Sequence, residues 1–260
     1  MVRRGFTLLE VLVSISIIGA LLGIAAAALR PSIDVARSLR VLAVVRSDGQ
    51  ITQQYAADTH HWPHYAKSQL NDAFENGGVG RPYFNQQWYW MLELHTYFGD
   101  GDIVQNPIAY SPWHPIYEMF DNGATAFDQP FAQFGAGAAI PNSITLSTAL
   151  FTSDAMWSAT NPVLTVSQLK AVPADAVQYP SNKVMYFESV PWHLARDEAD
   201  PRFAGAVDGS WPVPVTMVDG SGRVVPGREL PAPVLNPFYP EGLFSGVLLN
   251  TRRGHQGRDF

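Results

Sequence analysis

The longest pattern in the chain is an apolar stretch at its start. In the 24 residues from Phe6 to Leu29, Glu10 is the only charged residue, and as a helix they would span about 36 Å. The hydrocarbon core of a bilayer is about 30 Å thick, so this stretch is long enough for one tilted crossing. Arg3 and Arg4 precede it and place its start on the cytoplasmic side. The pattern predicts a membrane-spanning helix over residues 6–30.

Helical periodicity resumes after this stretch. We expect Pro31 to kink or interrupt the helix, because proline removes a backbone donor and crowds the preceding turn. Gly49 is a second expected weak point, and Pro63 must end the helix, which we expect to stop near Asp58. Residues 31–58 are therefore predicted to be an amphipathic continuation. The apolar positions expected on one face are Val35, Leu39, Leu42, Ile51 and Tyr55.

Residues 59–260 are expected to form one extracytoplasmic headgroup. Helices are expected at Phe84–Phe98 and Ser147–Met156, and strands at Lys183–Phe187, Val213–Val218 and Arg223–Val225.

Asp219-Gly220-Ser221-Gly222 lies between the last two strands and predicts a hairpin, because Gly tolerates positive φ. Pro212 and Pro214 indicate that the strand over Val213–Val218 is an edge strand. The predicted fold class is α+β, with a long N-terminal helix packed on an antiparallel sheet that carries long loops.

Composition supports a loop-rich exported domain with one sizeable core or two small ones. The 260 residues are 47% apolar and 15% charged, with 21 Gly and 20 Pro. No Cys is present, which excludes disulfides, thiolate zinc sites and cysteine nucleophiles. Net charge is −6, and loss of Arg3 and Arg4 would lower it to −8. Without a basic stripe, nucleic-acid binding is not expected.

Glu10 lies near the start of the predicted membrane helix and calls for a partner. Insertion scales put a central Asp at about +2.5 to +3.5 kcal/mol, and a position nearer the interface costs less. If the chain is cut between Gly5 and Phe6, the new α-amino group of Phe6 is a cation one turn from Glu10. The same carboxylate could also reach the Phe6 amine of a neighbouring copy.

The segment Gly5-Phe6-Thr7-Leu8-Leu9-Glu10-Val11 resembles the prepilin cleavage and methylation motif of type IV pilins and type II secretion pseudopilins. The resemblance implies that residues 1–5 are a leader peptide, and that a prepilin peptidase cuts after Gly5 and methylates the amine of Phe6. Glu10 would then serve assembly. Residues 50–63 also resemble the end of the long helix in pseudopilins.

The function implied is that of a structural subunit rather than an enzyme. It would be stored in the inner membrane with an extracytoplasmic headgroup and then packed with other pilins into a periplasmic or extracellular filament.

A second resemblance concerns the later half of the chain. Residues 179–186, His193 and the Val218–Ser221 segment resemble large prepilin-like proteins of planctomycete-type bacteria. Those proteins carry a His, nine residues and then Asp-Gly. Here Gly209 stands ten positions before Asp219, so the motif is incomplete.

Other readings of the N-terminus and the headgroup remain open. The apolar stretch could be an uncleaved anchor, or a secretory signal peptide cut near Ala25–Ala28. A tethered module could bind carbohydrate or protein through its many aromatic residues, although core packing is the simpler explanation for them. A tethered hydrolase would need a convergent polar cleft.

Candidate chemistry in the headgroup is sparse. His60, His61 and His64 could bind a metal on a helix, but Pro63 favours a loop with solvated histidines. Asp100 and Asp102 lie in a polar turn that could supply oxygen ligands to a calcium ion. Gln105 and Asn106 follow and carry further side-chain oxygens. No Gly-x-Ser-x-Gly elbow or glycine-rich phosphate loop is present, and Asp197, Glu198 and Asp200 are expected in a solvated loop.

Overall fold

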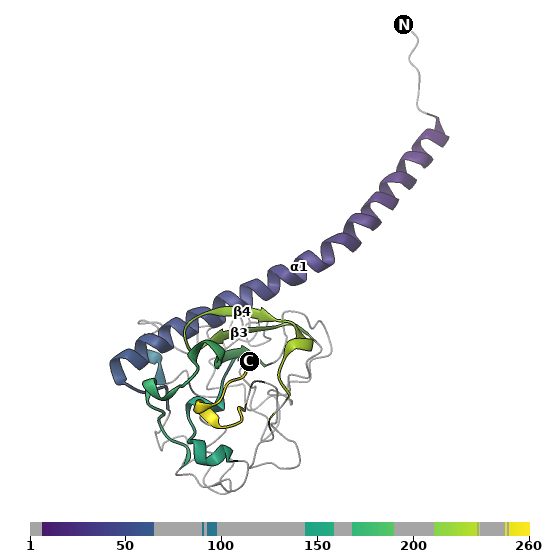
Figure 1. Cartoon of the computed structure of the whole chain (residues 1–260). Helices are drawn as coiled ribbons and strands as arrows, with labels where there is room; N and C mark the ends of the chain where they lie inside the picture. Colours follow the sequence, from purple (N-terminus) through teal and green to yellow (C-terminus); the bar gives the residue numbers. More distant parts are fainter. Residues whose placement is uncertain are drawn as a thin grey trace, which may run out of the picture. The chain divides into compact units, whose positions relative to one another are not determined.

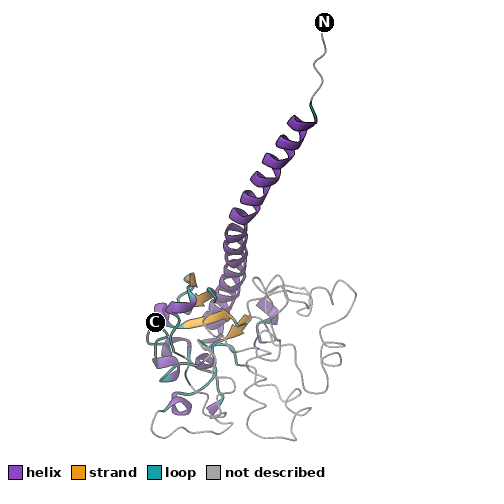
Figure 2. Ribbon diagram, turned by 90° about the vertical axis from the view of Figure 1, so that its right-hand side faces the viewer, coloured by secondary structure: helices purple, strands orange, loops and turns teal. Residues whose placement is uncertain are grey.

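A computed structural model describes residues 7–64, 90, 93–97, 144–158, 168–189, 211–232, 234, 248 and 250–260. The chain divides into two compact units, Met1–Arg37 and Ser38–Phe260. The elements, drawn in Figures 1 and 2, are one α-helix, four strands and short 3-10 helices (η). In order they are α1 Leu8–Thr59, η1 His95–Tyr97, β1 Ile144–Leu146, η3 Thr148–Leu150, η4 Asp154–Trp157, η6 Ala174–Ala176, η7 Pro180–Asn182, β2 Val184–Glu188, β3 Val213–Met217, β4 Gly222–Val225, η9 Gly227–Glu229 and η10 Gly254–Gln256.

The helix α1 is 52 residues long and runs through Pro31 without a break. Of the two expected effects of Pro31, an interruption is therefore wrong, and a kink stays a prediction. One proline removes one hydrogen bond, while long helical segments on both sides keep theirs, and helix formation is cooperative. The helix ends at Thr59, within a residue of the expected stop. His60 adopts a left-handed conformation with φ 63°, and its N–H donates to the Ala56 carbonyl at 2.9 Å.

The four strands form one antiparallel sheet in the order β1-β2-β3-β4. The expected strands at β2, β3 and β4 are confirmed. The helix expected at Ser147–Met156 is wrong, because this segment folds as η3 and η4 with an extended residue, Thr152, bridged to Leu169 between them. Within the predicted helix at Phe84–Phe98, Trp90 and Glu93 are helical and His95–Tyr97 form η1, while the extent of the helix lies outside the described residues.

The hairpin predicted between β3 and β4 is confirmed. Gly220 has φ +82°, and the Met217 N–H donates to the Ser221 carbonyl at 2.8 Å. Asp219 Oδ1 accepts from the Ser221 N–H at 2.9 Å and from its hydroxyl at 2.6 Å. This side chain therefore fixes the turn locally, as Asp does in Asx-turns.

β3 lies inside the sheet, so the expected edge position is wrong. Because Met217 donates toward β4, alternation along the strand turns the backbone nitrogen of Pro214 toward β2. The register between β2 and β3 ends at Val215, the residue that follows the proline in sequence, so Pro214 itself is not paired with β2. Pro214 thus falls where no bond to β2 is required, and an interior strand tolerates it.

The sheet has a hydrophobic core on each face, one under α1 and one on the opposite face. An irregularity in β2 lets this strand contribute residues to both. The β2–β3 register shifts between Val184 and Tyr186. Met185 and Tyr186 consequently join the core under α1, while Val184 and Phe187 join the core on the other face. The second core also contains Val213, Val215, Met217, Val225 and Leu248, with Trp211, Leu230 and Phe260 packed against it.

Within the unit Ser38–Phe260, α1 packs on the sheet along a buried seam at spacings of three and four residues. We call this the helix seam; its residues are Ser38, Val41, Val45, Asp48, Gly49, Thr52, Tyr55 and Ala56. The face expected from the apolar pattern is wrong in part, because Val35 and Leu39 are exposed. Five of the eight seam residues are small or polar, and a pattern of large apolar residues therefore misses the seam.

Gly49 is a close approach of α1 to the sheet, and α1 continues through it. A Cβ built at Gly49 would lie 2.5 Å from Cγ2 of Thr216, which is fully buried on β3. Threonine is stiff about χ1, so it cannot easily move away. A hydrogen at this position is what allows the two backbones to meet.

We predict that Gly49→Ala lowers the stability of the headgroup by about 1–3 kcal/mol, because the added methyl overpacks the seam. In a Thr216→Ser background, which lacks Cγ2, the same change should be neutral or stabilising, since Ala is favoured over Gly in helices by about 1 kcal/mol. Denaturant unfolding of the four variants in detergent checks this. Equal losses in both backgrounds would contradict the proposed contact.

Candidate functional site

The start of α1 is closed by a reciprocal pair of hydrogen bonds between Thr7 and Glu10. Oε2 of Glu10 accepts from the Thr7 N–H and from the Thr7 hydroxyl, both at 2.8 Å. The Glu10 N–H in turn donates to Thr7 Oγ1 at 3.3 Å. This is a capping box, in which two donors of the first helical turn are satisfied by side chains. In the uncleaved chain the carboxylate of Glu10 therefore has a partner within its own helix.

The helix that follows is apolar and uncovered. Every residue from Thr7 to Leu29 is exposed within the chain. Its two serines bond inward, with the Ser14 hydroxyl donating to the Glu10 carbonyl at 2.7 Å and the Ser16 hydroxyl to the Leu12 carbonyl at 2.8 Å. Backbone and serine groups are thus satisfied without water, as a membrane interior requires. The segment is long and apolar enough to cross a membrane.

Gly5 and Phe6 lie outside the described residues. Their cleavage, the methylation of Phe6 and its pairing with Glu10 therefore stay predictions. The structure adds that Glu10 is held at the first turn of an exposed apolar helix. A carboxylate in that place is accessible to a cation on a neighbouring helix.

The predicted metal candidates divide between described and undescribed regions. Asp100 and Asp102 lie outside the described residues, as do Gln105 and Asn106. His60, His61 and His64 follow the end of α1 in a loop, as Pro63 indicated. In the part of the chain that the structure describes, no group of three or more His, Asp or Glu could hold a metal ion.

The described tryptophans serve the core. Trp62, Trp90 and Trp157 are buried in the core under α1, with exposed fractions of 4%, 1% and 6%, and Trp211 packs against the second core. For these four, core packing is confirmed. Trp88, Trp113 and Trp192 fall outside the described residues. These four tryptophans therefore do not support the alternative hypothesis, in which exposed aromatic residues bind carbohydrate or protein.

Asp48 is a buried ionisable residue that the sequence did not reveal as a candidate for a functional role. It lies on the helix seam, is fully buried, and neither of its oxygens has a hydrogen-bond partner. Burial raises its pKa well above the ordinary value of 3.8. Next along the seam, Thr52 bonds the Tyr186 hydroxyl at 2.7 Å, and the charge of Asp48 adds to burial in raising the pKa of that tyrosine. A sequence pattern could have flagged Asp48 only as an acid at a core-facing helical position.

A second missed group joins residues far apart in the chain. Lys183, directly before β2, lies with its Nζ 3.8 Å from Oδ1 of Asp259, and both side chains are buried. The two residues are 76 positions apart. No local pattern indicates such a contact.

The arrangement of one long helix on a four-stranded antiparallel sheet, with an exposed apolar first half, is that of an α+β protein with a pilin-like fold. Residues 1–26 match the family model of the prokaryotic N-terminal methylation motif. The chain therefore carries the signature of type IV pilins and pseudopilins, as its first residues predicted. The motif supports a pilin-like, structural role. No curated protein and no solved structure matches the chain.

This match ends at residue 26 and does not reach the region of the second resemblance. The planctomycete-type assignment therefore stays a prediction.

The raised pKa of Asp48 makes the stability of the headgroup depend on pH. Below pH 3.8 the carboxyl is protonated in both the folded and the unfolded state. As pH rises, the unfolded chain releases its proton while the folded chain keeps it, so the free energy of unfolding falls by about 1.4 kcal/mol per pH unit until the folded-state pKa is passed.

We predict that Asp48→Asn removes this loss, because the amide copies the shape of the neutral acid and cannot ionise. The variant should be more stable than the parent by about 1–3 kcal/mol at pH 8, with a smaller difference at pH 4. Asp175→Asn, at an exposed position in η6, is the matched control. Denaturant unfolding curves of the parent and both variants at pH 4 and pH 8 measure these differences. A parent more stable than Asp48→Asn at pH 8 would mean that Asp48 is ionised and paired.

Proposed function

We propose that this protein is a pilin or pseudopilin subunit, cut by a prepilin peptidase between Gly5 and Phe6, methylated on Phe6 and assembled into a type IV pilus-like or type II secretion filament. The observation that carries the proposal is the methylation motif on residues 1–26, which overlaps an apolar helix whose residues from Thr7 to Leu29 are all exposed. Residues 1–5 are the leader, 6–30 the membrane and filament-core segment, 31–58 its amphipathic continuation, and 59–260 the extracytoplasmic headgroup.

An uncovered apolar helix needs an apolar environment, and two are open to it. Before assembly the inner membrane surrounds it; afterwards the helices of neighbouring subunits do. Leu, Ile and Val gain little from this exchange, because lipid tails are as apolar as side chains. Close packing then depends on small residues. Gly19 and Gly23 are four residues apart, and a Cβ at either would meet nothing within 4 Å. Another helix could approach closely there.

Glu10 gains most from the exchange, because a carboxylate in a membrane helix needs a cation. In the uncleaved chain the nitrogen of Phe6 belongs to a neutral peptide bond, and Glu10 caps the helix through Thr7. Cleavage turns that nitrogen into an amine, and the amine of one copy can pair with Glu10 of the next. Processing thereby creates the charge that assembly uses, which keeps uncut subunits from joining.

The processing step has a direct test. Co-expressed with an active prepilin peptidase, the membrane-extracted chain should begin at N-methylated Phe6, and Gly5→Val should keep Met1. Intact mass and N-terminal sequencing read both. A parent chain that still begins at Met1 beside a peptidase active on another prepilin would support the alternative, an uncleaved tethered module that binds carbohydrate or protein.

Assembly should depend on the charge of Glu10 and not on its capping hydrogen bonds. Glu10→Gln keeps the capping box, which accepts Gln as well as Glu, but removes the charge. Thr7→Ala removes the two capping bonds made by the Thr7 hydroxyl and keeps the charge. We expect both variants to be processed, Thr7→Ala to form filaments, and Glu10→Gln to lose most of them.

The measurement is the amount of subunit in sheared filaments, divided by the total amount of processed subunit, for each variant. Glu10→Ala, which lacks both the charge and the capping side chain, is the reference. Normal filaments from Glu10→Gln would refute the amine–carboxylate pairing. Loss in Thr7→Ala alone would assign the role to the helix cap.

A further inference from the structure

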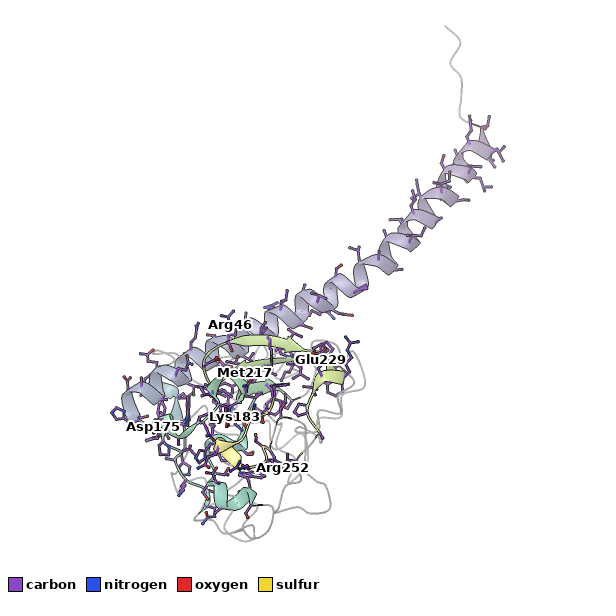
Figure 3. The ribbon with its side chains drawn as sticks, in the orientation of Figure 1. Arg46, Asp175, Lys183, Met217, Glu229 and Arg252 are labelled. Atoms are coloured by element: carbon purple, nitrogen blue, oxygen red, sulfur yellow. The ribbon has the colours of Figure 1, made fainter. Side chains whose placement is uncertain are left out.

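Lys183 is a buried lysine with too few acceptors for an ammonium ion. Its side chain is fully buried, and Nζ donates one hydrogen bond, at 2.9 Å, to the Gly254 carbonyl. Figure 3 shows the labelled Lys183 beside the yellow C-terminal segment, to which Gly254 belongs. An ammonium has three donors, and Oδ1 of Asp259, at 3.8 Å, lies beyond hydrogen-bond distance. The amine thus has one hydrogen-bond acceptor, the Gly254 carbonyl, and lies beside the carboxyl group of Asp259.

Asp259 is held with its carboxyl group next to that amine. Its Oδ2 accepts from the Val184 N–H at 2.7 Å, and its Oδ1 accepts from the Thr251 hydroxyl at 2.6 Å. Its own N–H donates to the Asn182 carbonyl at 2.8 Å. Backbone and side chain are thus fixed from three directions. The oxygen nearer to Lys183 also has a hydroxyl group beside it that can pass a proton.

Burial moves both groups toward their neutral forms. It lowers the pKa of Lys183 to about 8, against the opposing effects of Asp259 and Asp154. It raises the pKa of Asp259. In water an amine and a carboxyl group exchange a proton and become unreactive ions; here the neutral amine and the carboxylic acid are more accessible.

We propose that Lys183 and Asp259 become joined by an intramolecular amide bond. Nζ attacks Cγ of Asp259, a C–N bond forms, and Oδ1 leaves with two protons as one molecule of water. Oδ2 becomes the amide oxygen, where the Val184 N–H stabilises the charge that develops during attack. The Thr251 hydroxyl relays a proton to the departing Oδ1. Amine plus carboxylic acid gives amide plus water, so no other reactant is needed.

The surroundings favour this reaction over chemistry on an outside molecule. Lys183 is fully buried, so no external substrate reaches it, whereas Asp259 is already in place. Holding two groups together replaces a bimolecular step by a unimolecular one and raises their effective concentration. Release of water from a buried site further opposes the reverse hydrolysis.

The bond would close a loop between the residue before β2 and the segment Thr251–Phe260. That segment contacts several parts of the headgroup. Gly254 packs against Asp154 and Trp157 of η4, and Phe260 packs against the second core. A chain with no cysteine has no disulfide to hold these parts. An amide would supply a covalent tie that is insensitive to reducing agents.

The test is the intact mass of the full chain, folded and extracted in detergent. The amide form should be lighter than the sequence by about 18 Da, the mass of the released water. Proteolysis should then yield a branched peptide that joins the Lys183 segment to the Asp259 segment. Lys183→Arg removes the reacting amine and does not form the amide, so it should show the full mass and only linear peptides.

A parent chain with the full mass and only linear peptides would overturn the proposal. A mass deficit that persists in Lys183→Arg would do the same, because the water would then have been lost elsewhere. The parent measurement alone is decisive even if Lys183→Arg folds poorly. Leader removal and methylation change the same spectrum at the N-terminal peptide, so the outcome is independent of the proposed function.

Discussion

The structure depends on one constraint: a single helix must satisfy two different environments. The first part of α1 exposes every side chain from Thr7 to Leu29 and satisfies its serines internally. From Ser38 onward the same helix buries a continuous seam against the sheet. Because an isolated apolar helix is unfavourable in water, the first part requires lipid or other helices. The second part supplies the core on which the rest of the headgroup is built.

Close packing and polar groups matter for the contact between the helix seam and the sheet, beside the burial of apolar side chains. Gly49 lets α1 meet Thr216 closely, and Thr52 bonds Tyr186 across the interface. A buried acid, Asp48, directly precedes Gly49 on the helix. Polar groups in an interior are unfavourable unless they are satisfied or neutral, so they penalise any sliding of α1 that would lose these contacts. We infer that they fix the register of the helix on the sheet.

Chemistry and architecture are separated along the chain. The residues for which the methylation motif implies a reaction, Gly5 and Phe6, lie in the segment 1–26 that matches the motif. In the described part of the headgroup the ionisable side chains of interest, Asp48, Lys183 and Asp259, are buried away from any external substrate. This distribution fits a protein that works by being processed, packed and displayed, with its own reactivity confined to its interior.

Local signals in the sequence determined α1, strands β2 to β4 and the hairpin at Gly220. Each depends on residues within a few positions of one another, through apolar runs, alternation or a glycine that tolerates positive φ. Only the tertiary structure decided which face of α1 is buried, that β3 is an interior strand despite Pro214, that Ser147–Met156 is not a helix, and that Lys183 meets Asp259. Those outcomes depend on what packs from distant parts of the chain, and neither periodicity nor composition encodes a partner 76 residues away.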